Sequence, residues 1–180
     1  MGETLSDVGE MGLLSRLFRL LPNAEGVAVG PGDDAAVINV PPGKLLVFTT
    51  DAMVEGVHFN RRYMSAEDIG WRLACANLSD LAAMGARPGV GVVSLAFPPS
   101  APTEEAEAFY RGLTAHSGAY GLAVVGGDVV ASPGPWFAAM AVAGWVTPGE
   151  ELTRAGARPG DVIAITGEVG LAAAGWDLIR

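Results

Sequence analysis

Aspartates recur at four places in this sequence where a purely structural role would be awkward. Asp34 precedes an apolar run, Asp51 and Asp128 follow apolar runs, and Asp80 lies inside an otherwise apolar segment. Carboxylates in such surroundings repel one another, and each costs several kcal/mol if it is left unpaired. Few basic residues are nearby to pair with them. Hard divalent cations would resolve the conflict, because Mg²⁺ is usually held by a few carboxylates together with the phosphates of a substrate.

Hydroxyl groups and glycines accompany these aspartates. Thr49, Thr50 and Ser79 each lie within two residues of one of them and offer further oxygen ligands for a hard cation. Gly126-Gly127 precedes the last aspartate, after an expected strand, and its backbone N–H groups could approach a phosphate. An acidic chain can therefore bind a polyphosphate through metal ions instead of through lysines.

A structural alternative stays open for some of these residues. An Asp beside a Gly is often only a turn residue, which applies to Asp33 and to Asp128. A lone His is more often structural than functional, but His58 lies in a polar loop with Arg61 and Arg62 close behind it. That setting favours a phosphate contact. The signal for a metal site is the joint recurrence of the aspartates, since none of them is diagnostic alone.

Composition excludes several classes of protein. The 180 residues include 20 Asp and Glu against 11 Lys and Arg, which gives a net charge of −9, and half of the chain is apolar. A disordered chain would be poorer in apolar residues, and a non-specific nucleic-acid binder would need basic stripes. Cys75 is the single cysteine, so no internal disulfide is possible. The sequence also contains no Gly-x-x-x-x-Gly-Lys-Ser/Thr loop and no Gly-x-Gly-x-x-Gly fingerprint after a strand.

No segment is expected to anchor the chain in a membrane. The longest stretch without charge, residues 129–149, is interrupted by Pro133, Pro135, Gly144 and Pro148, whereas a membrane span needs about 20 predominantly apolar residues in a helix. The acidic N-terminus lacks the pattern of a secretory signal, so the cytoplasm is the expected location.

The elements that must position these residues follow from hydrophobic spacing and from turn residues. A helix is expected over residues 6–21, and the apolar runs 35–40 and 45–50 are expected to form a hairpin around the turn 41–44. The clearest helix spans 65–85, with Ser65 as its N-cap and Asp68 completing a capping box. A second helix should begin at Thr103, whose hydroxyl can cap it. Strands are expected at 90–97, 122–125, 137–146 and 161–166, and a last helix from 170 onward.

This order of elements predicts an α/β (α+β) fold with a mixed sheet flanked by helices. A domain boundary is expected at Thr147-Pro148-Gly149, where turn residues follow the strand 137–146. Residues 1–147 would then form one domain. Residues 148–180 are too few for a second one, so we interpret them as the start of a truncated C-terminal domain.

Five blocks of this sequence together resemble those of thiamine-monophosphate kinases. The blocks are Gly-Asp-Asp-Ala-Ala at 32–36, Thr-Thr-Asp-Ala-Met-Val-Glu-Gly-Val-His-Phe at 49–59, Asn-Leu-Ser-Asp-Leu-Ala-Ala-Met-Gly-Ala at 77–86, Gly-Gly-Asp at 126–128 and Leu-Thr-Arg-Ala-Gly-Ala-Arg-Pro-Gly-Asp at 152–161. They cover nearly the whole chain in order. The second and third are specific, whereas Gly-Asp-Asp and Gly-Gly-Asp alone would not be.

The resemblance implies a chemistry and an assembly. It implies ATP- and Mg²⁺-dependent phosphorylation of thiamine monophosphate to thiamine diphosphate, a step of thiamine diphosphate biosynthesis. It also implies the fold of the aminoimidazole-ribonucleotide synthetase superfamily, in which the N-terminal domains of a homodimer pair their sheets into a barrel. Such pairing would protect exposed sheet edges.

The resemblance also implies roles for individual residues. Direct or water-mediated metal ligands would be Asp34, Thr49, Thr50, Asp51, Asp80 and Asp128, with Asp33 behind them. His58 would contact the phosphate of thiamine monophosphate, and the ATP contacts would be Tyr110, Gly127, Asp128 and Arg154.

Two departures from the family pattern matter. Val129 stands after Gly-Gly-Asp where the family usually has Thr, so one hydroxyl contact near a phosphate is expected to be lost. The C-terminal domain of the family, which carries further ligands and closes over the thiamine ring, is not found in these 180 residues. The chain is therefore expected to be a fragment that is inactive, or nearly so, on its own.

Two rival interpretations stay open. The first is another ATP-dependent enzyme of the same superfamily, such as a selenophosphate synthetase or a formylglycinamidine-type synthetase, which the Val-Glu-Gly-Val-His-Phe block at 54–59 argues against. The second is a dimerisation module or a divalent-metal binder without catalytic activity, which would keep the fold and lack the chemistry.

Overall fold

The computed structural model describes residues 3–21 and 24–179 and shows one four-stranded mixed sheet with two long helices on one side. The strand order is β3 (Leu45–Val54), β6 (Phe137–Val146), β4 (Arg87–Phe97) and β5 (Ala123–Ala131). Strand β6 runs antiparallel to both of its neighbours, and β4 runs parallel to β5. This mixed sheet confirms the predicted fold class.

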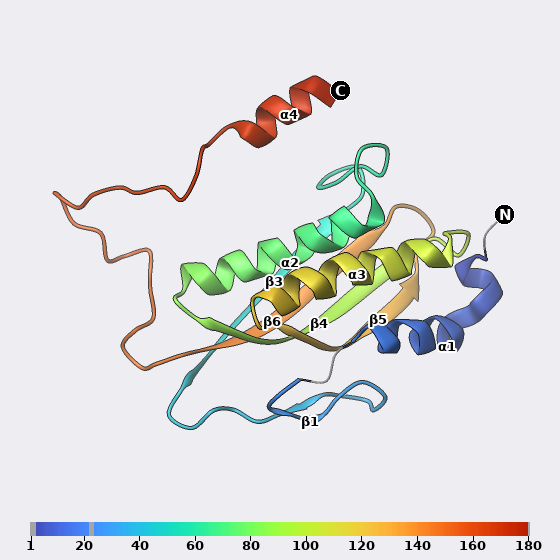
Figure 1. Ribbon diagram of the computed structural model, residues 1–180, viewed down its shortest axis with the longest axis horizontal. Coiled ribbons are helices and arrows are strands. Elements are labelled where there is room, and N and C mark those ends of the chain that lie inside the picture. Colours follow the sequence, from blue (N-terminus) through green and yellow to red (C-terminus); the bar gives the residue numbers. More distant parts are fainter. Residues whose placement is uncertain (1–2, 22–23, 180) are drawn as a thin grey trace.

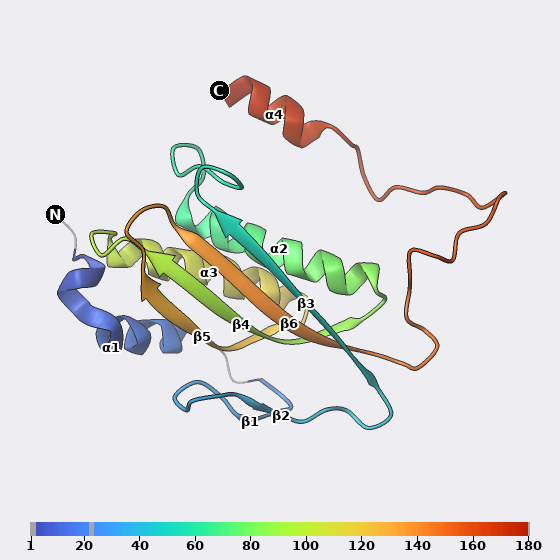
Figure 2. The same cartoon turned by 180° about the vertical axis from the view of Figure 1, so that it is seen from behind.

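Helices α2 (Ala66–Ala83) and α3 (Thr103–Ala119) cover one face of the sheet (Figure 1). Seen from behind, in Figure 2, no helix of the described residues lies over the opposite face. The hydrophobic core lies between the helices and the sheet. It contains the buried side chains of Ile69, Leu73, Phe109, Leu113 and Met140.

Two glycines let α2 and α3 pack unusually close. A Cβ atom on Gly70 would lie 2.0 Å from the Phe109 carbonyl oxygen, and one on Gly112 would lie 2.0 Å from the Glu67 carbonyl oxygen. Real Cβ atoms never come this close to a backbone oxygen. Backbone therefore contacts backbone at this crossing. The position of α2 over the sheet depends on both glycines.

Helix α2 begins as its sequence predicts. The Ser65 hydroxyl accepts a hydrogen bond from the Asp68 N–H at 3.1 Å, and the Asp68 carboxylate accepts one from the Ser65 N–H at 3.1 Å. Helix α3 begins at Thr103 as predicted, but the predicted cap is wrong. Its N-cap is Pro102, and the Thr103 hydroxyl is buried with no hydrogen-bond partner among the described residues.

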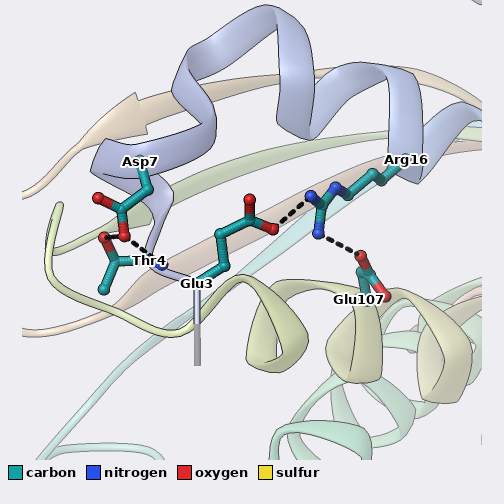
Figure 3. Close-up of polar contacts among 5 residues, drawn as sticks. All are labelled: Glu3, Thr4, Asp7, Arg16 and Glu107. Atoms are coloured by element: carbon teal, nitrogen blue, oxygen red, sulfur yellow. Dashed lines mark hydrogen bonds and ion pairs between the residues drawn. The ribbon is translucent and has the colours of Figure 1, made fainter. Parts of the chain in front are cut away.

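The N-terminal helix α1 (Leu5–Leu17) is held against α3 by charged contacts, which Figure 3 shows. Arg16 forms ion pairs with Glu3 and with Glu107 of α3. The Thr4 N–H donates to the Asp7 carboxylate at 2.9 Å, and hydrogen bonds from Thr4 lower the pKa of that carboxyl group.

The helix predicted over 6–21 ends earlier than expected. Helix α1 stops at Leu17, and a 3₁₀ turn, Phe18–Leu20, follows it.

The predicted hairpin of runs 35–40 and 45–50 is wrong. Strand β2 (Val37–Ile38) pairs with β1 (Val27–Val29) in a separate two-stranded sheet, and β3 pairs along its whole length with β6. The turn itself forms, because Lys44 N–H donates to the Pro41 carbonyl at 3.3 Å. The long strand β3 finds a partner of equal length in β6, which the short run 35–40 could not offer.

The predicted strand ends also need correction. Strand β5 does not stop at residue 125 but continues through Gly126, Gly127 and Asp128 to Ala131. Its pairing with β4 shifts by one residue between Gly91 and Val92, which marks a β-bulge. A Cβ atom on Gly127 would lie 2.2 Å from the Val93 carbonyl oxygen. Glycine is therefore needed here for close strand packing and not for a turn.

The last 33 residues described lie outside this core. Residues 147–170 run away from the sheet, and α4 (Leu171–Ile179) follows as predicted (Figure 1). Residues 161–166 form no strand, contrary to the prediction, because they are exposed and have no neighbouring strand to satisfy their backbone groups. The Trp176 ring of α4 lies edge-on to Tyr63 at 5.6 Å. Within the described residues, no helix is long and apolar enough to cross a membrane.

The close crossing of α2 and α3 yields a stability prediction. Gly70→Ala or Gly112→Ala should lower the free energy of unfolding by about 2–3 kcal/mol, because the added methyl group must push two backbones apart. Urea denaturation measures the change. Gly118→Ala, in α3 like Gly112→Ala, is the matched control, since a Cβ atom on Gly118 would meet nothing within 4 Å. Equal stability of all three variants would contradict the close contact.

Candidate functional site

Strand β3 and helix α2 bring three of the predicted ligand residues together. The Thr49 hydroxyl donates a hydrogen bond to Asp80 Oδ2 at 2.7 Å, and the Asp51 N–H donates to Asn77 Oδ1 at 3.1 Å. Thr49 and Asp51 are two residues apart on a strand, so both point toward α2. Asn77 and Asp80 are three apart on a helix, so both point toward β3. We call Thr49, Asp51, Asn77 and Asp80 the β3–α2 junction.

Asn77 was missed as a site residue by the sequence analysis. Its side chain is fully buried, and both ends of its amide are used: Nδ2 donates to the Leu73 carbonyl at 3.0 Å, while Oδ1 accepts from Asp51. A buried polar group of this kind must be hydrogen-bonded. The signal was an amide at an apolar position of the helix, one turn before Asp80.

Thr50 points to the other side of the sheet. Strand residues alternate between faces, so Thr50 lies on the open face while its two neighbours face α2. Its hydroxyl donates to the Met140 carbonyl of β6 at 2.9 Å. The sequence predicted that Asp51 follows the strand 45–50. In the structure Asp51 lies inside β3, which continues to Val54.

Asp34 and Asp128 occupy a second location, on the open face. Together with Asp33 and Gly127 they line a cavity of about 520 Å³ between the loop 30–36 and the sheet. The Asp33 carboxylate accepts a hydrogen bond from the Asp34 N–H at 2.9 Å, which shapes this loop.

The predicted ligands are thus divided between two faces of the sheet. Asp128 pairs with Ser94 of β4, Ser94 with Ala139 of β6, and Ala139 with Ala52 of β3. Asp128 therefore lies level with the residue after Asp51 but three strand spacings away, roughly 14 Å. Among residues 3–21 and 24–179, no three His, Cys, Asp or Glu side chains form a group that could hold a metal by themselves.

His58 lies in the loop that follows β3. The Nδ1 atom of its ring accepts a hydrogen bond from the Val54 backbone N–H at 3.1 Å, and the backbone N–H of His58 donates to the Val54 carbonyl at 2.9 Å. A neutral imidazole that accepts at Nδ1 carries its proton on Nε2. The residue is exposed, so Nε2 can donate to an anionic oxygen of a ligand.

The predicted ATP contacts differ in accessibility. Arg154 is exposed in the segment after β6. Tyr110 lies in the core beside Phe109, where only 4% of it is exposed and burial raises the pKa of its hydroxyl. In this structure Tyr110 supports the packing of α3 and offers almost no surface to a nucleotide.

Val129, the departure from the family pattern, packs against the hydrophobic core. By strand alternation it faces away from its neighbour Asp128. Its apolar side chain therefore suits this position.

The comparisons with known proteins agree with this fold. A model of the family "AIR synthase related protein, N-terminal domain" matches residues 32–146. The match covers more than half of the chain and includes the whole four-stranded sheet, the β3–α2 junction and the His58 loop. The chain therefore belongs to the AIR synthase related protein family.

Particular relatives are thiamine-monophosphate kinases. The enzyme of Synechococcus elongatus is 41% identical over 172 residues, which are 96% of this chain and 51% of the relative. The crystal structure of the enzyme of Stenotrophomonas maltophilia is 36% identical, with a TM-score of 0.68 over 78% of this chain and 43% of that one. A structure described as AaThiL complexed with AMPPCP and TMP is 30% identical, with a TM-score of 0.56 over 82% of this chain and 45% of that one. The chain spans about half the length of the curated relatives it matches.

The buried amide of the junction yields a second stability prediction. Asn77→Ala should lower the free energy of unfolding by about 1–3 kcal/mol, because the Asp51 N–H would lose its partner. Ser79→Ala, two residues along the same helix and exposed, should change it by less than about 0.5 kcal/mol. Chemical denaturation of both variants provides the measurement, and equal values would show that the Asn77 amide does not join α2 to β3.

Proposed function

We propose that the whole protein to which this chain belongs is an ATP-dependent kinase that phosphorylates thiamine monophosphate to thiamine diphosphate. The observation that carries the proposal is the β3–α2 junction, because it joins the Thr49 hydroxyl to the Asp80 carboxylate and fixes Asp51 against Asn77, on the strand that leads into the His58 loop. The relatives named as thiamine-monophosphate kinases and the structure with AMPPCP and TMP support it.

The residues of this junction fit a hard divalent cation. Thr49, Asp51 and Asp80 offer only oxygen donors, and their number falls short of a complete protein cage. Mg²⁺ suits such a set, because it keeps several waters and is completed by substrate phosphates. When bound, the metal would neutralise charge on the phosphates.

The chain itself needs to supply little covalent chemistry. Phosphoryl transfer depends mainly on positioning and on electrostatic stabilisation, and the acceptor oxygen belongs to a phosphate that is already anionic. No strong general base is therefore required. The side chains of the junction hold the metal-binding oxygens in place, and His58 Nε2 donates a hydrogen bond to the acceptor phosphate. Arg154 is the proposed positive contact for ATP. Gly127 and Asp128 are the proposed nucleotide contacts of the open face.

We also propose that two copies pair through the open face. Phe48 is 67% exposed and Val92 is 42% exposed on this face, and β3 and β5 are the outer strands of the sheet. Closing two sheets into one barrel would cover these side chains and would pair the edges. It would also bring β5 of one copy beside β3 of the other. Asp128, which lies level with Ala52, would then approach the partner's β3.

Such a pairing would bring Asp128, which is three strand spacings from β3 within one chain, to the strand beside the partner's β3, with its side chain on the face opposite the β3–α2 junction. We expect the protein to act in the cytoplasm, and nothing in its charge favours a nucleic-acid partner.

Replacing a junction carboxylate should abolish catalysis without unfolding the protein. Asp51→Ala or Asp80→Ala in the intact protein should reduce phosphorylation of thiamine monophosphate at least about 100-fold, because phosphate charge would be left unneutralised. A coupled ADP-release assay measures the rate, and thermal unfolding checks the fold. Glu67→Ala, exposed at the start of α2, is the matched control. Loss of folding in either Asp variant would assign the carboxylate a structural role.

The same preparation separates the rival functions. Mg²⁺ binding by the intact protein should strengthen when an ATP analogue is present. Binding that is indifferent to nucleotide would favour a metal-binding or dimerisation module without catalysis.

The open face yields a prediction on assembly. Phe48→Glu should convert a dimer into a monomer, because the charge would be buried without a partner in the closed barrel. Light scattering after size-exclusion chromatography measures the mass. Met11→Glu is the control, since Met11 is 77% exposed and lies on helix α1, outside the sheet. A wild-type monomer, or a dimer that Phe48→Glu leaves intact, would contradict the proposed pairing.

A further inference from the structure

The loop that carries His58 is tied to the start of β6 by a closed pair of hydrogen bonds. The Glu55 backbone N–H donates to the Trp136 carbonyl at 2.9 Å, and the Glu55 carboxylate accepts from the Trp136 backbone N–H at 3.1 Å. Further along, the Gly56 N–H donates to the Phe59 carbonyl at 2.8 Å, and the Phe59 side chain is buried. The loop is therefore anchored at its beginning and at its middle.

Arg61 anchors the far end of this loop. Its guanidinium lies over the Trp136 ring, 4.3 Å from the ring centroid, and forms an ion pair with Glu105 of α3. One side chain thus joins three elements: the His58 loop, the residue before β6 and the first turn of α3. The planar guanidinium can stack on the indole and pair with a carboxylate at once, which a lysine ammonium does less well.

The Trp136 side chain depends on packing contacts. It is 2% exposed, its ring lies edge-on to Phe97 at 4.4 Å, and its indole N–H has no hydrogen-bond partner among the described residues. With no hydrogen bond to fix the indole, its position depends on packing contacts such as those with Phe97 and Arg61. Removing the guanidinium would free one side of the ring and the end of the loop together.

Arg62, the next residue, has a different setting. It is exposed, and its guanidinium lies over Tyr63, 5.8 Å from the ring centroid, so it contacts the loop itself and not the core. The two adjacent arginines carry the same charge, but it is Arg61 that attaches the loop to Trp136 and Glu105.

We propose that Arg61 is a positioning residue that holds His58 for the acceptor phosphate by clamping the loop 55–61 to Trp136 and Glu105. The role rests on the proposed function, in which His58 contacts that phosphate. Because the Arg61 charge is already paired with Glu105, it acts through the loop and not as a phosphate ligand.

Steady-state kinetics of the intact protein test the clamp. Arg61→Ala should raise KM for thiamine monophosphate roughly five- to tenfold and leave KM for ATP within about twofold, because only the His58 side of the site is loosened. Arg61→Lys should restore part of the loss, since it keeps the ion pair without the planar stack. Arg62→Ala is the matched control and should change neither constant. Equal effects of Arg61→Ala and Arg62→Ala would overturn the proposal.

The state of the His58 imidazole gives a readout that needs no activity. In ¹⁵N spectra of the wild type, His58 should show the tautomer protonated at Nε2, and Arg61→Ala should shift it toward a mixture of tautomers as the bond from Val54 loosens. His58→Gln assigns the signal, because the chain has only two histidines. A raised KM with an unchanged tautomer would make Arg61 a direct phosphate contact and would overturn the positioning role.

Two further outcomes distinguish a failure of the Arg61 proposal from a failure of the proposed function. If the wild type does not phosphorylate thiamine monophosphate, the proposed function fails, while the tautomer measurement still tests the clamp. If Arg61→Ala does not fold, Trp136→Phe provides the test, because it keeps the contact with Phe97 and weakens only the stack on Arg61. An unchanged His58 tautomer in folded Trp136→Phe and Arg61→Lys would overturn the proposal.

Discussion

The contact of helix α2 with strand β3 is the constraint on which the candidate site depends. Asn77 and Asp80 of the helix meet Asp51 and Thr49 of the strand through two hydrogen bonds, and the Asn77 side chain that makes one of them is buried. These bonds form only when the helix lies at one height over the sheet, and the backbone contact at Gly70 sets how closely α3 supports it from the other side. The small residues at the crossing of α2 and α3 therefore also determine where the carboxylates of the site lie.

The sequence predicted the elements that carry their own local signals. The capping box at Ser65 fixed the start of α2, and alternating or continuous apolar runs located β4 and β6 closely. Pairing was harder to predict, because the partner of β3 lies some 90 residues away and a neighbouring run with a good turn looked equally suitable. Thr103 failed for a similar reason: a residue type that often caps helices is buried here by tertiary packing.

The candidate site was predictable by residue type and only partly by position. The pattern of aspartates identified Asp51 and Asp80, which the structure brings to one junction. It could not show that Thr50 and Asp128 face the opposite side, because the side that a residue faces depends on where its strand begins and on the register shift between Val124 and Gly126 of β5. Asn77 was overlooked, since a buried amide has no distinctive spacing of its own.

The bond from Asp51 to Asn77 has a consequence for solubility. An outer strand normally presents a row of unused N–H and C=O groups, and such a row is a template on which misfolded chains can add and grow into aggregates. Here a helix side chain occupies one of those donors in the middle of β3, where a foreign strand would need continuous pairing. The amide that orders the junction thus removes the central donor from this edge, so a foreign strand cannot pair continuously there, and the proposed partner strand would pair only on either side of Asp51.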